Sequence, residues 1–320
     1  MAFYTLALLL LGYLLLWGVE LTKVWFKLPG RFVVLIVGAA IVVAAHGLHL
    51  YARVQAVHDH AGRWALPATF YDWTMIASFG LALVYLALTL RRRESVLGIF
   101  VVPLILAMVV GGISVRGNQP FERGGDATAV WAYVHGGGLA VAAISVSLGL
   151  AVSILRLWQQ RRLKAKRALG GPLRLPSLEY LDDFGRSCLL ASTAGVATGL
   201  TGGVVMNVFG DRGFSWTDPG IMLSGCLLVW MVLALLIELR ATRGGGSRTV
   251  ALNVISFVVT ASAMFFVASN AHGRGSVIAT ARTADWAAND RLSPQFSELA
   301  SDTPALRRMS SARSREGAAA

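Results

Sequence analysis

The chain has 320 residues, of which 55% are hydrophobic and only 14% are charged, and its mean hydropathy is +0.61. This composition indicates an integral membrane protein. The formal net charge of +12 does not predict nucleic-acid binding, because the basic residues lie mainly between apolar runs. There they set membrane orientation and attract anionic lipids.

Apolar runs of the length that a spanning helix needs, about 20 residues, recur along the chain. We expect eight spans, at residues 3–22, 32–52, 72–90, 96–113, 129–155, 187–208, 217–239 and 249–270. The first run lacks a basic start and a small-residue cleavage site, so we expect a true span there and not a signal peptide. Because a helix satisfies its own backbone groups in lipid, the sequence predicts an all-α, polytopic membrane bundle over residues 1–272.

The loops alternate in charge, and this alternation predicts the orientation. Lys and Arg concentrate after the first, third, fifth and seventh runs, whereas the intervening loops hold few. Since the more basic side faces the cytoplasm, we expect both termini outside a bacterial-type inner (plasma) membrane.

Two segments lie outside the expected spans. Residues 156–186 form a basic cytoplasmic link, in which the sequence Gly-Gly-Pro at 170–172 breaks the helix. Leu178, Leu181 and Phe184 share a face after this break and predict a short amphipathic helix along the membrane surface. Residues 273–320 show no sustained apolar period and are expected to form a flexible extracytoplasmic tail.

All six histidines fall at or near the expected extracytoplasmic face, and imidazole commonly binds haem iron and transition metals. His46 and His49 are three residues apart near the outer end of the second run, so they face roughly the same way. His58 and His60 follow in a polar stretch, where solvated loop residues are the ordinary interpretation. For His46 the ordinary interpretation is a bond to a carbonyl of a neighbouring helix.

His135 lies one turn into the fifth run and is followed by three glycines, Gly136 to Gly138. Missing side chains at these positions indicate either a flat ligand or a neighbouring backbone that packs closely, since glycine otherwise disfavours a helix. His272 closes the last run and could cap that helix or serve as a ligand. Haem iron held between His46 and His135 would require the two rings to face one another.

Motifs for hydrolysis or phosphoryl transfer are absent from the sequence, so an enzyme is not the expected class. Cys188 and Cys226 both lie within apolar runs and form no CxxCH pattern, which argues against covalent haem attachment. Trp216 and Asp218 open the seventh run at the outer boundary, where an aromatic belt is the ordinary interpretation of a tryptophan.

The order and spacing of several motifs resemble the CcsA/HemX-type cytochrome c assembly family, in particular its HemX/YpjD-like branch. His46 and Tyr51 match the second helix of that branch, and His135 stands where the family carries its histidine. The link is similar to the family pattern LPxLExLxxxxxR through Pro176, Leu178, Glu179, Leu181 and Arg186. The segment FSWTDPGIMLSGCLLVW resembles the tryptophan-rich WWD segment through Trp216, Asp218, Pro219, Ser224 and Trp230.

Two departures separate the chain from the haem-exporting members of that family. The full tryptophan-rich signature is missing, and Glu238 lies close to the position of a later histidine. His272 falls roughly where those members have a late external histidine, in a dissimilar context.

The resemblance implies a haem-handling protein of cytochrome c assembly that holds haem b transiently near the outer face. His46 and His135 would be the iron ligands, His272 a reserve ligand, and Trp216 and Asp218 the rim of the site. The partners that the resemblance implies are haem, an apocytochrome c or other assembly proteins, and membrane lipids, without nucleic acid. A haem-free scaffold or regulatory subunit, and a b-type electron carrier, remain alternatives.

Overall fold

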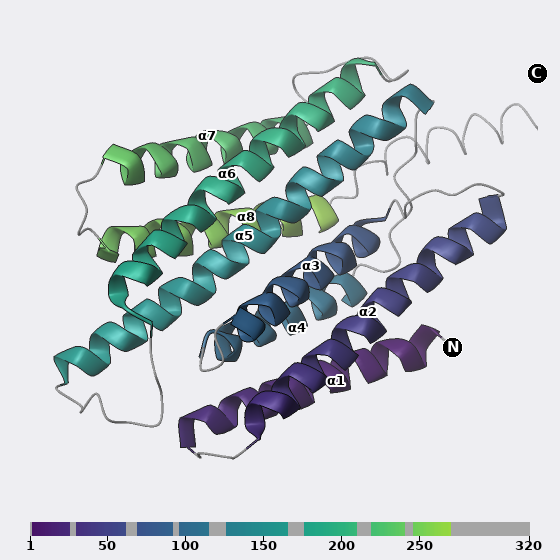
Figure 1. Cartoon of the computed structure of the whole chain (residues 1–320). Helices are drawn as coiled ribbons and strands as arrows, with labels where there is room; N and C mark the ends of the chain where they lie inside the picture. Colours follow the sequence, from purple (N-terminus) through teal and green to yellow (C-terminus); the bar gives the residue numbers. More distant parts are fainter. Residues whose placement is uncertain are drawn as a thin grey trace, which may run out of the picture. The chain divides into compact units, whose positions relative to one another are not determined.

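Eight helices make up the described part of the protein (Figure 1). The computed structural model describes residues 2–25, 30–61, 69–91, 96–114, 126–165, 176–209, 219–240 and 246–269. The helices are α1 (Ala2–Trp25), α2 (Arg31–Ala61), α3 (Phe70–Arg91), α4 (Gly98–Ser114), α5 (Asp126–Lys164), α6 (Leu178–Val208), α7 (Pro219–Arg240) and α8 (Gly246–Ser269).

The predicted all-α membrane bundle is confirmed by these helices. Seven of those described are long and apolar enough to cross a membrane, and α4, with 17 residues, is apolar but shorter. Large apolar side chains stay exposed on the outward faces, for example Leu8 on α1, Val33 on α2 and Val229 on α7. Such faces are compatible with lipid and not with water.

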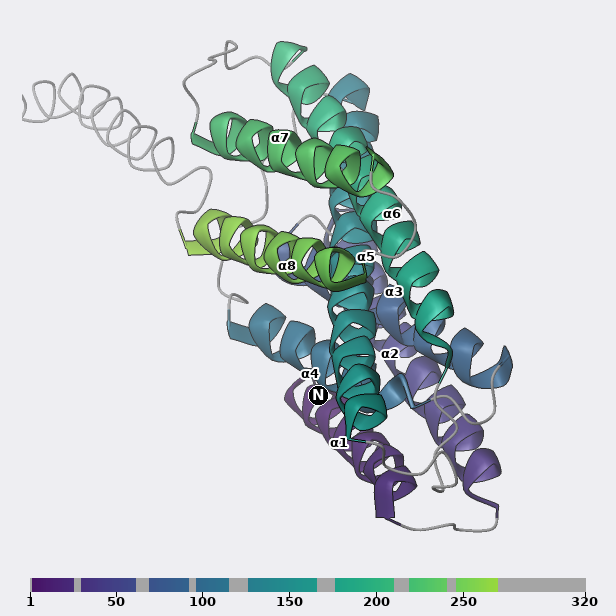
Figure 2. The same ribbon diagram turned by 90° about the vertical axis from the view of Figure 1, so that its left-hand side faces the viewer.

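Helix α5 is the central element. It packs along α6, and it also contacts α3, α4 and α8 (Figures 1 and 2). In its most apolar stretch 67% of the residues are buried inside the protein, against 28% for α1. Helix α5 therefore joins a first group of helices, α1 to α4, to a second group, α6 to α8.

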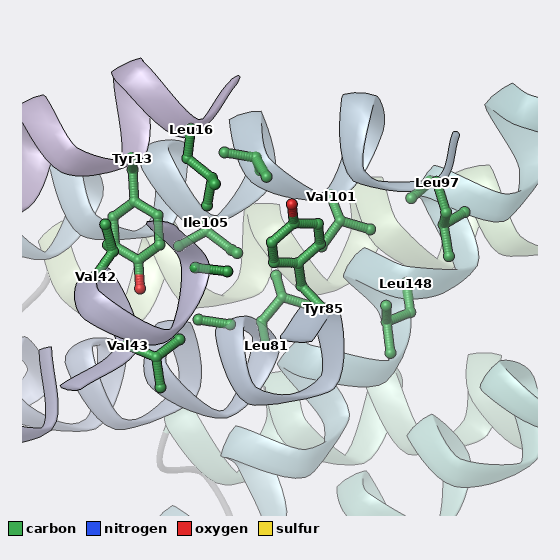
Figure 3. Close-up of a cluster of buried hydrophobic side chains, with 14 of the residues drawn as sticks. Tyr13, Leu16, Val42, Val43, Leu81, Tyr85, Leu97, Val101, Ile105 and Leu148 are labelled. Carbon is green, nitrogen blue, oxygen red and sulfur yellow. The ribbon is translucent and has the colours of Figure 1, made fainter. Parts of the chain in front are cut away.

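The largest hydrophobic core belongs to the first group and reaches α5. Leu16 of α1, Leu81 of α3 and Ile105 of α4 interdigitate there, and Leu148 adds the α5 side (Figure 3). A smaller core around Val146, Val196 and Met231 joins α5, α6 and α7. Burial of these side chains fixes which helix faces point inward.

Two local predictions were wrong. The segment that begins at Leu178 is not a separate surface helix, because Ser177 caps α6 and this helix continues without a break to Val208. Leu181 is buried in the large core, so this first part of α6 packs against the protein. The polar stretch that contains His58 and His60 continues α2 and is not a loop.

Candidate functional site

A seam lined by glycines brings α5 and α6 into backbone contact. A Cβ atom placed on Gly138 would lie 2.5 Å from the backbone nitrogen of Gly199. One placed on Gly202 would lie 2.7 Å from the backbone nitrogen of His135. The ring of Trp73, from α3, covers Gly136. Neighbouring protein groups therefore fill much of the space that the glycines leave, as the packing interpretation of Gly136 and Gly138 predicted.

His135 sits on this seam, half-buried, with its ring directed at α6. Its Nδ1 atom lies 2.6 Å from the carbonyl oxygen of Gly199. Because a carbonyl oxygen only accepts, Nδ1 carries the hydrogen and donates it. In a neutral imidazole, Nε2 then carries the lone pair, which is the arrangement of a typical metal-binding histidine.

The absence of a side chain at Gly203 also shapes this position. A Cβ atom on Gly203 would lie 2.8 Å from Nδ1 of His135. Any other residue at Gly203 would push the ring away from the Gly199 carbonyl. The sequence of α6 thus positions the imidazole of α5.

His46 has a different environment, between α1, α2 and α3. The residue is completely buried, and its Nδ1 lies 3.0 Å from the Tyr13 hydroxyl oxygen. Its ring meets the edges of Tyr13 and Phe79, with centroid distances of 6.0 and 5.5 Å. Its Nε2 makes no hydrogen bond within the described part of the chain, although the Met75 backbone interacts with the ring.

His49 is one turn further along α2 and is also buried. Its Nε2 lies 2.8 Å from the hydroxyl oxygen of Tyr71, and its Nδ1 lies 3.4 Å from Oγ1 of Thr5. Side chains of α1 and α3 thus engage both ring nitrogens. Such engagement is typical of a buried polar group in a membrane helix.

The structure does not bring His46 and His135 together. His46 contacts α1 and α3, whereas His135 contacts α6, and α3 lies between as the helix that packs against both α2 and α5. Phe79 of α3 covers the His46 ring and Trp73 of the same helix covers Gly136. This geometry does not support the two imidazoles as opposite ligands of one iron.

The other candidate residues cannot be placed. Trp216, Asp218 and His272 lie outside the described residues. Of the two histidines near the end of α2, His58 is half-buried, and the side chain of His60 also lies outside what the structure describes.

Several buried polar residues were not recognised from the sequence. Asp72 is buried on α3 and accepts hydrogen bonds from Arg53 and Thr69. Tyr85 of α3 donates to Glu20 of α1 at 2.7 Å. The available signal was the spacing of Thr5, Tyr13 and Glu20, which puts polar groups on one face of the otherwise apolar first span.

The two histidine positions differ in how well they fit a haem. At His135 the ring is half-buried, Nδ1 is tied to a carbonyl, and glycines of α6 flank it, so a bond to iron would be made through Nε2. At His46 the ring is enclosed by Tyr13 and Phe79, and a porphyrin would have to displace both. Among the described residues, no group of three or more His, Cys, Asp or Glu side chains is arranged to hold a metal ion.

Comparisons with known proteins leave the family open, since no family model, no curated protein and no solved structure matches the chain. The likeness to cytochrome c assembly proteins rests on the motifs in the sequence alone.

Proposed function

We propose that this protein handles haem in a membrane, and that it holds haem b through His135 as an axial ligand. The observation that carries this proposal is the 2.6 Å hydrogen bond from Nδ1 of His135 to the Gly199 carbonyl. It selects the tautomer whose Nε2 would bind iron, and it orients the ring. The motif resemblance around His135 and in the first turns of α6 supports the same assignment.

Transient binding suits the geometry around His135. A single bond from a half-buried imidazole would hold haem less firmly than a buried pair of histidines, and this would favour release to an acceptor such as an apocytochrome. Haem supplies the redox chemistry of its iron, and this chain supplies position and axial tuning. By sequence, His272 is the reserve ligand, with Trp216 and Asp218 at an external rim of a plasma-membrane site.

A haem titration of the purified, haem-free full chain tests the proposal. We expect a Soret band and a reduced α-band on addition of haemin, and the loss of both in His135→Ala. His135→Gly with imidazole in the buffer should restore the band, because free imidazole can replace a ligand but not a packing contact. His46→Ala should keep the band. If His46 and His135 were both ligands of one iron, this substitution would change the spectrum as well. Retention of the full spectrum in His135→Ala would overturn it.

A haem-free scaffold or regulatory subunit is the second candidate function. The observation that favours it is the separation of His46 from His135. Histidines whose described contacts are with neighbouring protein groups can stabilise the helix packing without binding a ligand. A wild-type chain that stays folded and colourless in excess haemin would support the scaffold. The third possibility, a permanent b-type electron carrier, needs two facing histidines, and the described histidines that can be placed do not provide such a pair.

A further inference from the structure

Polar side chains, most of them buried, form a line through the helices α1 to α3, apart from the His135 position. On α1 the line contains Thr5, Tyr13, Glu20 and Lys23, whose spacings of eight, seven and three residues place them on one helix face. Tyr13 and Glu20 are completely enclosed, and Lys23 is nearly so. Ionisable groups inside membrane helices are costly to bury, and they commonly mark ion or proton pathways.

The first part of the line lies at the end where α1 begins. Arg53 of α2 pairs with the buried Asp72 at 2.9 Å, and its guanidinium carbon lies 5.3 Å from the centre of the Tyr71 ring. The Tyr71 hydroxyl contacts Nε2 of His49, and Nδ1 of His49 contacts the exposed Thr5. This segment connects the surface to a buried imidazole.

The middle part consists of His46 and Tyr13. His46 follows one helical turn deeper than His49, a rise of about 4.5 Å. Its Nδ1 contacts the Tyr13 hydroxyl, and its Nε2 lacks a hydrogen-bond partner among the described residues. The groups that face this imidazole are Tyr13 from α1, His49 from its own helix, and Phe79 and the Met75 backbone from α3.

The last part lies near the end of α1. Glu20 accepts a hydrogen bond from Tyr85 and pairs with Lys23 at 2.6 Å. Arg31, at the start of α2, adds a further positive charge near Lys23 and donates to the Thr22 carbonyl at 3.4 Å. A carboxylate is thus held close to the opposite membrane face.

An apolar layer separates the middle part from the last part. Seven residues of α1, a rise of about 10.5 Å, separate Tyr13 from Glu20. Figure 3 shows Leu16 and Ile105 in the space between the rings of Tyr13 and Tyr85, with Leu81 below the Tyr85 ring. Such a layer keeps two polar segments from forming a continuous leak.

We propose that α1 to α4 form a gated proton path across the membrane, from the Arg53–Asp72 pair through His49, His46 and Tyr13 to Glu20. His49 is suited to relay because both its ring nitrogens contact hydroxyl groups. It takes a proton on one nitrogen and releases one from the other, so only N–H and O–H bonds change and no electron moves. Onward transfer needs a side-chain rotation that brings the rings of His49 and His46 together, because the described contacts of His49 are with Tyr71 and Thr5 and that of His46 is with Tyr13. His46 then gives a proton to the Tyr13 hydroxyl as that hydroxyl releases its own, and the Glu20 carboxylate takes up the released proton when the apolar layer opens.

Proton flux into vesicles tests this path without haem, so its outcome is separate from that of the haem proposal. The full chain, haem-free, is reconstituted into phosphatidylcholine–phosphatidylglycerol vesicles that contain a pH-sensitive dye. A valinomycin-induced potassium diffusion potential then drives protons inward. We expect wild-type vesicles to acidify faster than protein-free vesicles, and His46→Leu and Glu20→Gln to lower the rate to the protein-free level.

Ser192→Ala is the matched control, because Ser192 is a buried polar residue of α6 that donates to the Leu189 carbonyl of its own helix. It should keep the wild-type rate. If His46→Leu does not fold, the nearly isosteric Glu20→Gln decides the test. The proposal is overturned if wild-type vesicles acidify no faster than protein-free ones, if Glu20→Gln keeps the wild-type rate, or if Ser192→Ala loses the flux equally.

Discussion

Gly138 of α5 and Gly195 of α6 each occupy the position where the other has no room for a side chain. A Cβ atom on Gly138 would lie 2.8 Å from the Gly195 carbonyl oxygen, and one on Gly195 would lie 2.8 Å from the Gly138 carbonyl oxygen. Close backbone approach through small residues is a common basis of helix association in membranes. This contact sets the distance between the helix that carries His135 and the helix that accepts its hydrogen bond.

Gly138→Ala should therefore destabilise the protein. The added methyl group meets backbone atoms, which cannot rotate away, so we expect a loss of about 1–3 kcal/mol, typical of overpacking. Thermal unfolding in detergent, followed by tryptophan fluorescence, measures the change.

Gly137→Ala is the matched control on the same helix, because a Cβ atom there has no neighbour within 4 Å. It should leave the unfolding temperature almost unchanged. Equal destabilisation by the two substitutions would show that backbone contact with α6 is not the cause.

Gly203→Ala should act on the His135 ring more than on the fold. Its Cβ atom would lie 2.8 Å from Nδ1 of His135, so the ring must turn and weaken its bond to the Gly199 carbonyl. We expect the ¹⁵N resonance of Nδ1 to move toward that of a nitrogen without a strong acceptor, and haem affinity to fall if His135 is the ligand.

Gly225→Ala on α7 provides the comparison, since a side chain there meets nothing within 4 Å. An unchanged His135 resonance in Gly203→Ala would contradict the positioning role of Gly203.

The sequence predicted the helices well because the length of an apolar run directly limits where a spanning helix can lie. It did not predict that α2 continues to Ala61, because polar residues in a helix that leaves the membrane lack an apolar period. It also could not distinguish a separate amphipathic helix at Leu178 from the first turns of α6. Both patterns have the same period, and only the packing of Leu181 into the core separates them.

The candidate site was less predictable than the fold, because it depends on which helices are neighbours. His46 and His135 share a depth in the expected topology, but depth does not fix lateral position. Packing of α3 against both α2 and α5 separates the two histidines. Tyr13 and Tyr71, which contact His46 and His49, come from other spans and could not be paired with them by spacing.

The Arg156–Asp182 pair should stabilise the junction of α5 and α6. The Arg156 side chain is about 10% exposed and donates to both Asp182 oxygens, with Nη2 3.3 Å from Oδ2. Asp182→Ala would leave a nearly buried guanidinium without its carboxylate. Because Asp182 itself is 28% exposed, we expect a loss of about 1–3 kcal/mol, less than for a fully buried pair.

Chemical denaturation in mixed micelles checks this loss, with Asp183→Ala as the neighbouring control. Asp183 is exposed, and its described hydrogen bond is made through the backbone carbonyl, which accepts from the Ser187 hydroxyl. A midpoint for Asp182→Ala equal to that of Asp183→Ala would show that the ion pair does not stabilise the fold.

Tyr71→Phe and Tyr51→Phe should differ, although each removes a single hydroxyl group. The Tyr71 hydroxyl is buried and contacts Nε2 of His49, so its loss takes a partner from an imidazole inside the bundle. We expect a cost of about 1–3 kcal/mol, the desolvation penalty of a buried polar group. Tyr51 is 56% exposed and its oxygen accepts only from the nearby Gln55 within the described chain, so Tyr51→Phe should cost little. Unfolding midpoints of the two variants, measured side by side in the same detergent, check the difference, and equal midpoints would contradict a stabilising contact between Tyr71 and His49.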